Sequence, residues 1–154
     1  MLTYLGNSTL AMADIFHDFP IFAPPEQVFD AVTSPEGLAT WWTEHTSGKP
    51  SPGTTYELGF GPSYHWRAEV CKCVPQTEIE WEFTHADEDW LGTRVGFSLI
   101  PKEHFTQVHF HHTGWPGMNA HYRTSSFCWA MYLRLLKRYV EHGEVVPYDK
   151  RLDV

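Results

Sequence analysis

One long stretch near the end of the chain, from about residue 119 to 142, contains no Gly or Pro and is rich in good helix formers. Its apolar residues, from Phe127 and Trp129 to Val140, recur at helical spacing, and Gly143 is placed to end the helix. At 1.5 Å per residue such a helix is roughly 35 Å long. No other stretch predicts a helix of this length. A sheet formed by the rest of the chain therefore has only this element to cover its apolar face.

The middle of the chain is predicted to form strands in series. The clearest strand is residues 78–83, "EIEWEF", in which Ile79, Trp81 and Phe83 alternate with glutamates. This alternation is typical of an antiparallel sheet with one face in the core and the other in water. Related patterns predict further strands over residues 14–22, 55–60, 64–74, 93–101 and 105–113.

Two short helices are predicted after the first strand. Residues 24–32 open with two prolines, which suit a helix start, and continue with an apolar stripe at helical spacing. Ser34 is a capping residue, and Pro35 takes the first position of a second helix that ends at residue 42. Residues 43–53 are polar and rich in Gly and Pro, so we expect a loop there.

The length and net charge of the chain limit the classes of function that it can have. With 154 residues the chain suits one domain, which we place at residues 14–143, with residues 1–13 and 144–154 as peripheral termini. The net charge of −8 disfavours binding to nucleic acid and to an anionic membrane surface. No apolar run approaches a membrane span, and the N-terminus lacks the basic residues of a signal peptide. We expect a soluble, cytoplasmic protein.

The cysteines predict neither a disulfide framework nor a zinc site. Cys71 and Cys73 lie two apart in a strand and are expected on the same face, while Cys128 lies in the final helix. An odd count argues against a disulfide scaffold, and a structural zinc site needs a second ligand pair that the sequence lacks. We expect free thiols, no metal and no cofactor.

Five segments, in this order and spacing, resemble a known family: residues 23–42, 68–83, 93–101, 108–115 and 127–143. The chain resembles the bacterial single-domain relatives of the C-terminal domain of the activator of Hsp90 ATPase (AHSA1-like), in the START-like, Bet v 1-like (SRPBCC) superfamily. The resemblance implies an α+β helix-grip fold, in which a curved antiparallel sheet wraps around the C-terminal helix and leaves a hydrophobic cavity. It also implies binding of lipids, sterols, polyketides or ring compounds. The family has no single catalytic motif, so no catalytic residue is carried over.

Three histidines cluster in residues 108–116, "VHFHHTGWP". If Val108 and Phe110 face the core, alternation turns His112 inward and His109 and His111 outward. The outer pair supplies at most two ligands, too few for a stable metal site. His112 either bonds a ligand, with general acid–base chemistry open to it, or is a buried histidine satisfied within the protein.

The aromatic content of 16% favours a flat or apolar ligand. We predict binding of a small hydrophobic or aromatic molecule in the cavity between sheet and helix. Two alternatives stay open: an enzyme with cyclase-like or hydrolase-like proton transfer in the same cavity, and a chaperone-related interaction module. A homodimer is compatible with the sequence but not established by it. The candidate ligand-binding residues are Trp42, Tyr56, Leu58, Phe60, Tyr64, Trp66, Trp81, Phe83, Phe97, Phe110, His112, Trp115 and Trp129.

Overall fold

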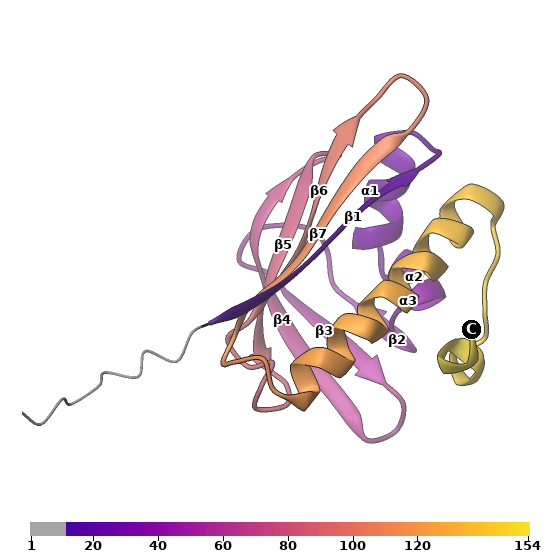
Figure 1. Ribbon diagram of the computed structural model, residues 1–154. Coiled ribbons are helices and arrows are strands. Elements are labelled where there is room, and N and C mark those ends of the chain that lie inside the picture. Colours follow the sequence, from indigo (N-terminus) through magenta and orange to yellow (C-terminus); the bar gives the residue numbers. More distant parts are fainter. Residues whose placement is uncertain (1–11) are drawn as a thin grey trace, which may run out of the picture.

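The computed structural model describes residues 12–154, so the prediction for residues 1–11 lies outside the described part. Within that part the chain forms one sheet, three α-helices and a short 3-10 helix (Figure 1). The elements are β1 (Ala13–Ile21), α1 (Pro25–Thr33), α2 (Pro35–Trp41), β2 (His45–Ser47), β3 (Thr55–Phe60), β4 (Tyr64–Val74), β5 (Glu78–His85), β6 (Arg94–Pro101), β7 (Thr106–Trp115), α3 (Ala120–His142) and η1 (Tyr148–Asp153).

The sheet has seven strands in the order β1-β7-β6-β5-β4-β3-β2, and neighbouring strands are antiparallel. It bends around α3, which crosses its inner side, with α1 and α2 beside the helix (Figure 1). β1 and β2 form the two edges of the sheet. This arrangement confirms the predicted α+β helix-grip fold.

Local signals placed the helices correctly. The Ser34 side chain accepts a hydrogen bond from the backbone N–H of Gly37 at 2.9 Å and caps α2. The Asn119 side chain caps α3 by accepting a hydrogen bond from the backbone N–H of Tyr122 at 2.9 Å. Gly143 ends α3 in the left-handed conformation at φ 67°.

Phe127 corrects the predicted apolar face of α3. The core face of the helix contains Ser125, Trp129, Leu133 and Leu136, which are all buried. Phe127 is 78% exposed. At about 100° per residue, its side chain points about 160° away from those of Ser125 and Trp129. It therefore lies on the opposite side of the helix, in water.

A bulge corrects the predicted placement of the cysteines. The pairing of β4 with β5 shifts register between Val70 and Lys72, so Cys71 is the extra residue. Cys71 is exposed, whereas Cys73 stands opposite Ile79 and packs against the core. The two thiols are therefore on different faces. Both are free, as is Cys128.

Two further segments are more ordered than their composition indicates. The loop predicted for residues 43–53 includes β2, a strand too short to show alternation. The C-terminal segment includes η1, whose Arg151 is only 3% exposed. Its guanidinium donates to the backbone carbonyls of Ala39 at 2.7 Å and Thr43 at 3.0 Å, so η1 is bonded to the end of α2.

Candidate functional site

The centre of the interface between sheet and α3 is filled by the protein's own side chains. Phe97 and Phe110 meet at a centroid distance of 5.3 Å, and Phe110 lies 4.6 Å from Trp129. The large rings occupy the space in which the sequence predicted the deep part of a hydrophobic cavity. The candidate ligand-binding residues that are buried are Trp42, Tyr56, Leu58, Trp81, Phe83, Phe97, Phe110, His112, Trp115 and Trp129.

Trp42 and the three candidates that are not buried, Phe60, Tyr64 and Trp66, border a groove where the packed interior reaches the surface. We call it the aromatic groove. Its volume is about 220 Å³. The residues that line it are Trp42, Phe60, Tyr64, Trp66, Asp87, Trp90 and Tyr132. Four of the candidate residues therefore line a shallow groove rather than a deep cavity.

The β3–β4 hairpin supplies one wall of the aromatic groove. Phe60 and Tyr64 pair across the turn, where Gly61 adopts φ 72°. Trp66 follows two residues later on the same strand face, and its ring lies 5.2 Å from that of Phe60. The tight turn thus brings three aromatic side chains to one end of the sheet.

Three different elements close the groove around this hairpin. Trp42 follows α2 and lies 5.3 Å from Phe60. Trp90, from the loop between β5 and β6, lies 4.9 Å from Trp66. Tyr132 comes from α3, and burial is the main reason that its pKa is raised to about 12. The Tyr132 hydroxyl is therefore uncharged at neutral pH.

Trp90 carries a polar group that the protein leaves unused. Its indole Nε1 is buried and has no hydrogen-bond partner among the described residues. A buried donor without a partner costs about 1–3 kcal/mol.

His112 is buried and fully satisfied within the protein. Trp129 Nε1 is only a donor, and it donates to His112 Nδ1 at 3.0 Å. Nε2 therefore carries the proton and donates to Thr93 Oγ1 at 2.8 Å, and that hydroxyl donates to the carbonyl of Trp90 at 2.6 Å. Chiefly through burial, the pKa of His112 is lowered to about 3. His112 is thus neutral, has no exposed surface and matches the alternative of a satisfied core histidine.

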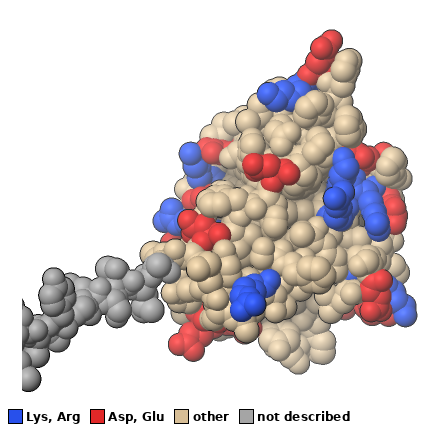
Figure 2. All heavy atoms as spheres, in the orientation of Figure 1, with Lys and Arg blue, Asp and Glu red and all other residues tan. Residues whose placement is uncertain are grey.

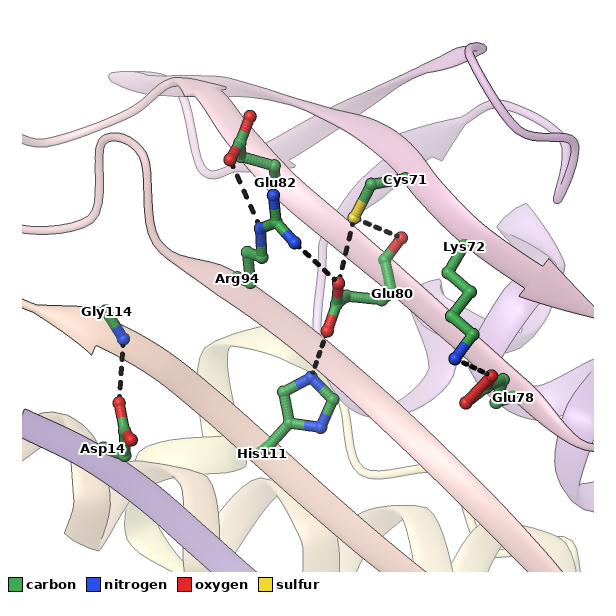
Figure 3. Close-up of polar contacts among 9 residues, drawn as sticks. All are labelled: Asp14, Cys71, Lys72, Glu78, Glu80, Glu82, Arg94, His111 and Gly114. Atoms are coloured by element: carbon green, nitrogen blue, oxygen red, sulfur yellow. Dashed lines mark hydrogen bonds and ion pairs between the residues drawn. The ribbon is translucent and has the colours of Figure 1, made fainter.

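The other two histidines lie on the outer face of the sheet, as predicted. His109 Nδ1 is 2.6 Å from Asp18 Oδ1 on β1. His111 Nε2 is 2.8 Å from Glu80 Oε2, two strands away (Figure 3). Among residues 12–154 no three His, Cys, Asp or Glu side chains are arranged to hold a metal ion. Strand alignment, which the sequence does not reveal, decides these partners.

Glu80 is the centre of a polar cluster on this face (Figure 3). Besides His111, it accepts hydrogen bonds from the Cys71 thiol at 3.2 Å and from Arg94 at 3.4 Å. Burial alone raises the pKa of Glu80. The hydrogen bonds from Cys71 and His111, with the charges of His111 and Arg94, outweigh burial, so the net pKa is below its ordinary value. Burial, aided by Glu80, raises the pKa of Cys71 to about 11, so this thiol is a poor nucleophile.

Sequence reasoning missed three residues that line the aromatic groove, namely Asp87, Trp90 and Tyr132. Trp90 follows the acidic loop residues Asp87 and Asp89, and no periodic pattern marks it as buried. Tyr132 falls on the predicted apolar face of α3, between the directions of Leu136 and Tyr139, so helical spacing was a signal that could have found it. Only the tertiary arrangement shows that these side chains meet the β3–β4 hairpin.

Comparisons with known proteins agree with this fold. Residues 22–141 match the family model described as Activator of Hsp90 ATPase homolog 1-like protein. No curated protein matches the sequence. Among the described residues, no helix is long and apolar enough to cross a membrane.

Several solved structures are similar to this chain. The solution structure of the Aha1 dimer from Colwellia psychrerythraea is 31% identical, with a TM-score of 0.79 over 86% of this chain and 99% of that chain. Protein MLL2253 from Mesorhizobium loti is 20% identical, with a TM-score of 0.76 over 86% of this chain and 100% of that chain. Protein BH1534 from Bacillus halodurans is 23% identical, with a TM-score of 0.71 over 84% and 97% of the two chains. The extent of the family match and the identity to the Colwellia protein show that the chain belongs to the Activator of Hsp90 ATPase homolog 1-like family.

Proposed function

We propose that this chain binds a small, flat, apolar or aromatic molecule in the aromatic groove. The observation that carries the proposal is the convergence of six aromatic side chains on one opening of about 220 Å³.

The volume of the groove limits the size of the ligand. Pockets for drug-sized molecules usually measure about 300–1,000 Å³. A groove of about 220 Å³ fits one ring or two fused rings. Burying about 200 Å² of apolar surface gives roughly 5 kcal/mol before the ordering costs of binding. Since about 5 kcal/mol corresponds to a dissociation constant on the order of 0.2 mM, we expect weak binding, with dissociation constants of roughly 0.1–1 mM.

Titration with 2-naphthol tests the proposal, because this probe has two fused rings and one hydroxyl group. We expect saturable quenching of tryptophan fluorescence. Tyr64→Ala removes a half-exposed wall of the groove with little risk to folding, and we expect about fivefold weaker binding. Phe127→Ala removes an exposed ring outside the groove and serves as the matched control. Absence of saturation up to millimolar probe, or equal losses in both variants, would overturn the proposal.

The enzyme alternative relied on His112, together with a tyrosine, as proton donor or acceptor. That side chain is fully buried, and both ring nitrogens are bonded to protein groups. We therefore propose no proton-transfer role for it. The free thiols support a further proposal, that the protein works in a reducing compartment such as the cytoplasm.

The family match favours a second candidate function, a chaperone-related interaction. The family model is described by activation of the Hsp90 ATPase. We propose that the whole chain contacts an Hsp90-type chaperone, and the rate of ATP hydrolysis by the purified chaperone with and without the chain tests this. An unchanged rate together with no co-elution would remove this candidate.

The Colwellia structure supports a proposal on assembly. That protein, 31% identical to this chain, is a dimer. We propose that this chain also forms a homodimer. Light scattering coupled to size-exclusion chromatography gives the mass of the protein directly. A mass of one chain at all tested concentrations would contradict the proposal.

A further inference from the structure

We propose that a second groove, between β1 and the C-terminal half of α3, binds a small organic carboxylate with an apolar chain. Its volume is about 390 Å³. The strand contributes residues 17–20, and the helix contributes Leu133, Arg134 and Lys137 among others. It shares no lining residue with the aromatic groove. We call it the edge groove.

The edge groove is bounded at both ends by contacts from α3 to the free edge of β1. At one end the Tyr122 hydroxyl donates to the carbonyl of Asp14 at 2.7 Å. At the other end Lys137 Nζ donates to the carbonyl of Pro20 at 2.7 Å, and Glu141 accepts from the N–H of Phe22 at 2.9 Å. Helix and strand are therefore held together at both ends, and a hollow of fixed length remains between them.

The floor of the edge groove is apolar, and its rim is cationic. Leu133 is only 3% exposed and Phe19 packs against the core, so both present apolar surface between strand and helix. Arg134 is exposed and has no carboxylate partner among residues 12–154. Lys and Arg side chains gather beside an uncharged surface near the C-terminal half of α3 (Figure 2).

Two charged residues that border the edge groove already have partners. Lys137 pairs with Glu141 at 2.6 Å. The Asp18 carboxylate bonds to His109 on the outer face of the sheet, at 2.6 Å. The guanidinium of Arg134 is thus the cation of the groove that has no carboxylate partner among the described residues. Its planar, doubly donating geometry matches the two oxygens of a carboxylate.

His17 lines the edge groove with a ring whose polar atom is turned into the core. Its ring stacks on Phe110 at a centroid distance of 6.1 Å, and its Nε2 atom is buried without a hydrogen-bond partner among the described residues. An apolar floor and a free guanidinium together fit an alkyl or aryl carboxylate.

Octanoate is a suitable probe, and ¹H–¹⁵N spectra of the full chain locate its binding. We expect saturable shifts in residues 16–20 and 130–137. Acetate has the carboxylate without the long alkyl chain, and 1-octanol has the alkyl chain without the carboxylate. Both should therefore bind about tenfold more weakly than octanoate. Equal affinity for octanoate and 1-octanol, or shifts confined to the aromatic groove, would overturn the proposal.

Variants of Arg134 test the charge. Arg134→Gln should weaken octanoate binding about tenfold, while Arg134→Lys should restore part of the affinity. Arg123→Gln is the matched control, because Arg123 is exposed on the same helix and does not border the groove. Unchanged affinity in Arg134→Gln, with unchanged melting temperature, would refute the assignment. This outcome would leave the aromatic groove unaffected, because 2-naphthol and Tyr64→Ala test separate residues.

Discussion

His112 shows how one residue couples burial to protonation. Its Nδ1 must accept from Trp129, so a second proton on the ring would destroy this hydrogen bond and place a charge in the core. This explains the direction of the shift from the ordinary pKa of 6.5 to about 3. The same two hydrogen bonds hold Trp129 and Thr93 in place, so the histidine organises the core.

The shifted pKa of His112 predicts acid sensitivity. Between pH 6.5 and about 3 the unfolded chain binds more protons at this site than the folded chain. Stability is therefore complete above pH 6.5 and falls by up to about 1.4 kcal/mol per pH unit below it. From pH 7 to 5 we expect His112 to account for a loss of about 2 kcal/mol in the free energy of unfolding.

Urea denaturation at both pH values measures this loss. His112→Asn keeps an acceptor oxygen near the position of Nδ1 for Trp129 but does not titrate, so its loss between pH 7 and 5 should be smaller by about 2 kcal/mol. The exposed His85→Gln is the control and should behave as the natural chain does. Identical pH dependence in all three proteins would contradict a neutral, buried His112.

Gly96 is the residue that lets His111 reach Glu80. It stands opposite both residues in the sheet, on the strand between them. A Cβ atom at Gly96 would lie 2.5 Å from His111 Cε1 and 2.8 Å from the carbonyl of Ile79. Gly96→Ala should therefore displace the imidazole and cost about 1–3 kcal/mol.

Gly117→Ala is the control for Gly96, since nothing lies within 4 Å of a Cβ built there. Unfolding in urea compares the two variants, and the His111 ring signals report the lost contact with Glu80. If both variants are equally stable, His111 does not depend on the open space at Gly96.

At the scale of elements, prediction succeeded where a side-chain pattern was long. The alternation of β5 and the Gly- and Pro-free stretch of α3 fixed their positions nearly to the residue. It failed for β2, which has three residues, and at the bulge in β4, where one extra residue moved Cys71 to the other face. Both features depend on pairing with a neighbouring strand, which a single sequence does not show.

The aromatic groove was only partly predictable for a related reason. Trp42, Phe60, Tyr64 and Trp66 lie in or next to periodic elements, so their inward direction followed from spacing. Trp90 lies in a loop, where spacing says nothing about direction. The number of large rings was visible in the composition, but whether they surround a hollow or fill it depends on three-dimensional packing.

η1 illustrates how a short terminal element can support the groove. Arg151 satisfies the carbonyls of Ala39, Thr43 and Val146, which surround the end of α2 next to Trp42. Arg151→Met keeps a long, unbranched side chain but removes all of its hydrogen-bond donors. We therefore expect the free energy of unfolding to fall by about 2–4 kcal/mol. Thermal unfolding measures the loss, and 2-naphthol binding should weaken with it because Trp42 loses support.

Lys150→Met is the matched control for Arg151. Lys150 is the exposed preceding residue, so its substitution should leave both stability and binding unchanged. If the two variants have the same melting temperature, the buried guanidinium does not hold η1 against α2.

For the whole molecule, the main result is a helix-grip domain whose interior is occupied. Phe110 is at its centre, with Phe97 at 5.3 Å, Trp129 at 4.6 Å and His17 at 6.1 Å. In such an interior, binding is confined to grooves at the margin unless a side chain moves. The two grooves described above lie at different margins of α3 and offer different chemistry, one aromatic and one cationic.

A substitution of Phe110 distinguishes a filled interior from a hollow one. Phe110→Ala should cost about 3–5 kcal/mol, because the transfer energy of the ring is lost and a cavity is created. Phe16→Ala, at a side chain that is 65% exposed, should cost little. An apolar cavity of this kind binds benzene. Benzene should therefore raise the melting temperature of Phe110→Ala but not that of the natural chain. A cost below about 1 kcal/mol, or the same benzene effect on both proteins, would mean that empty space already borders Phe110, because only a pre-existing hollow makes loss of the ring inexpensive.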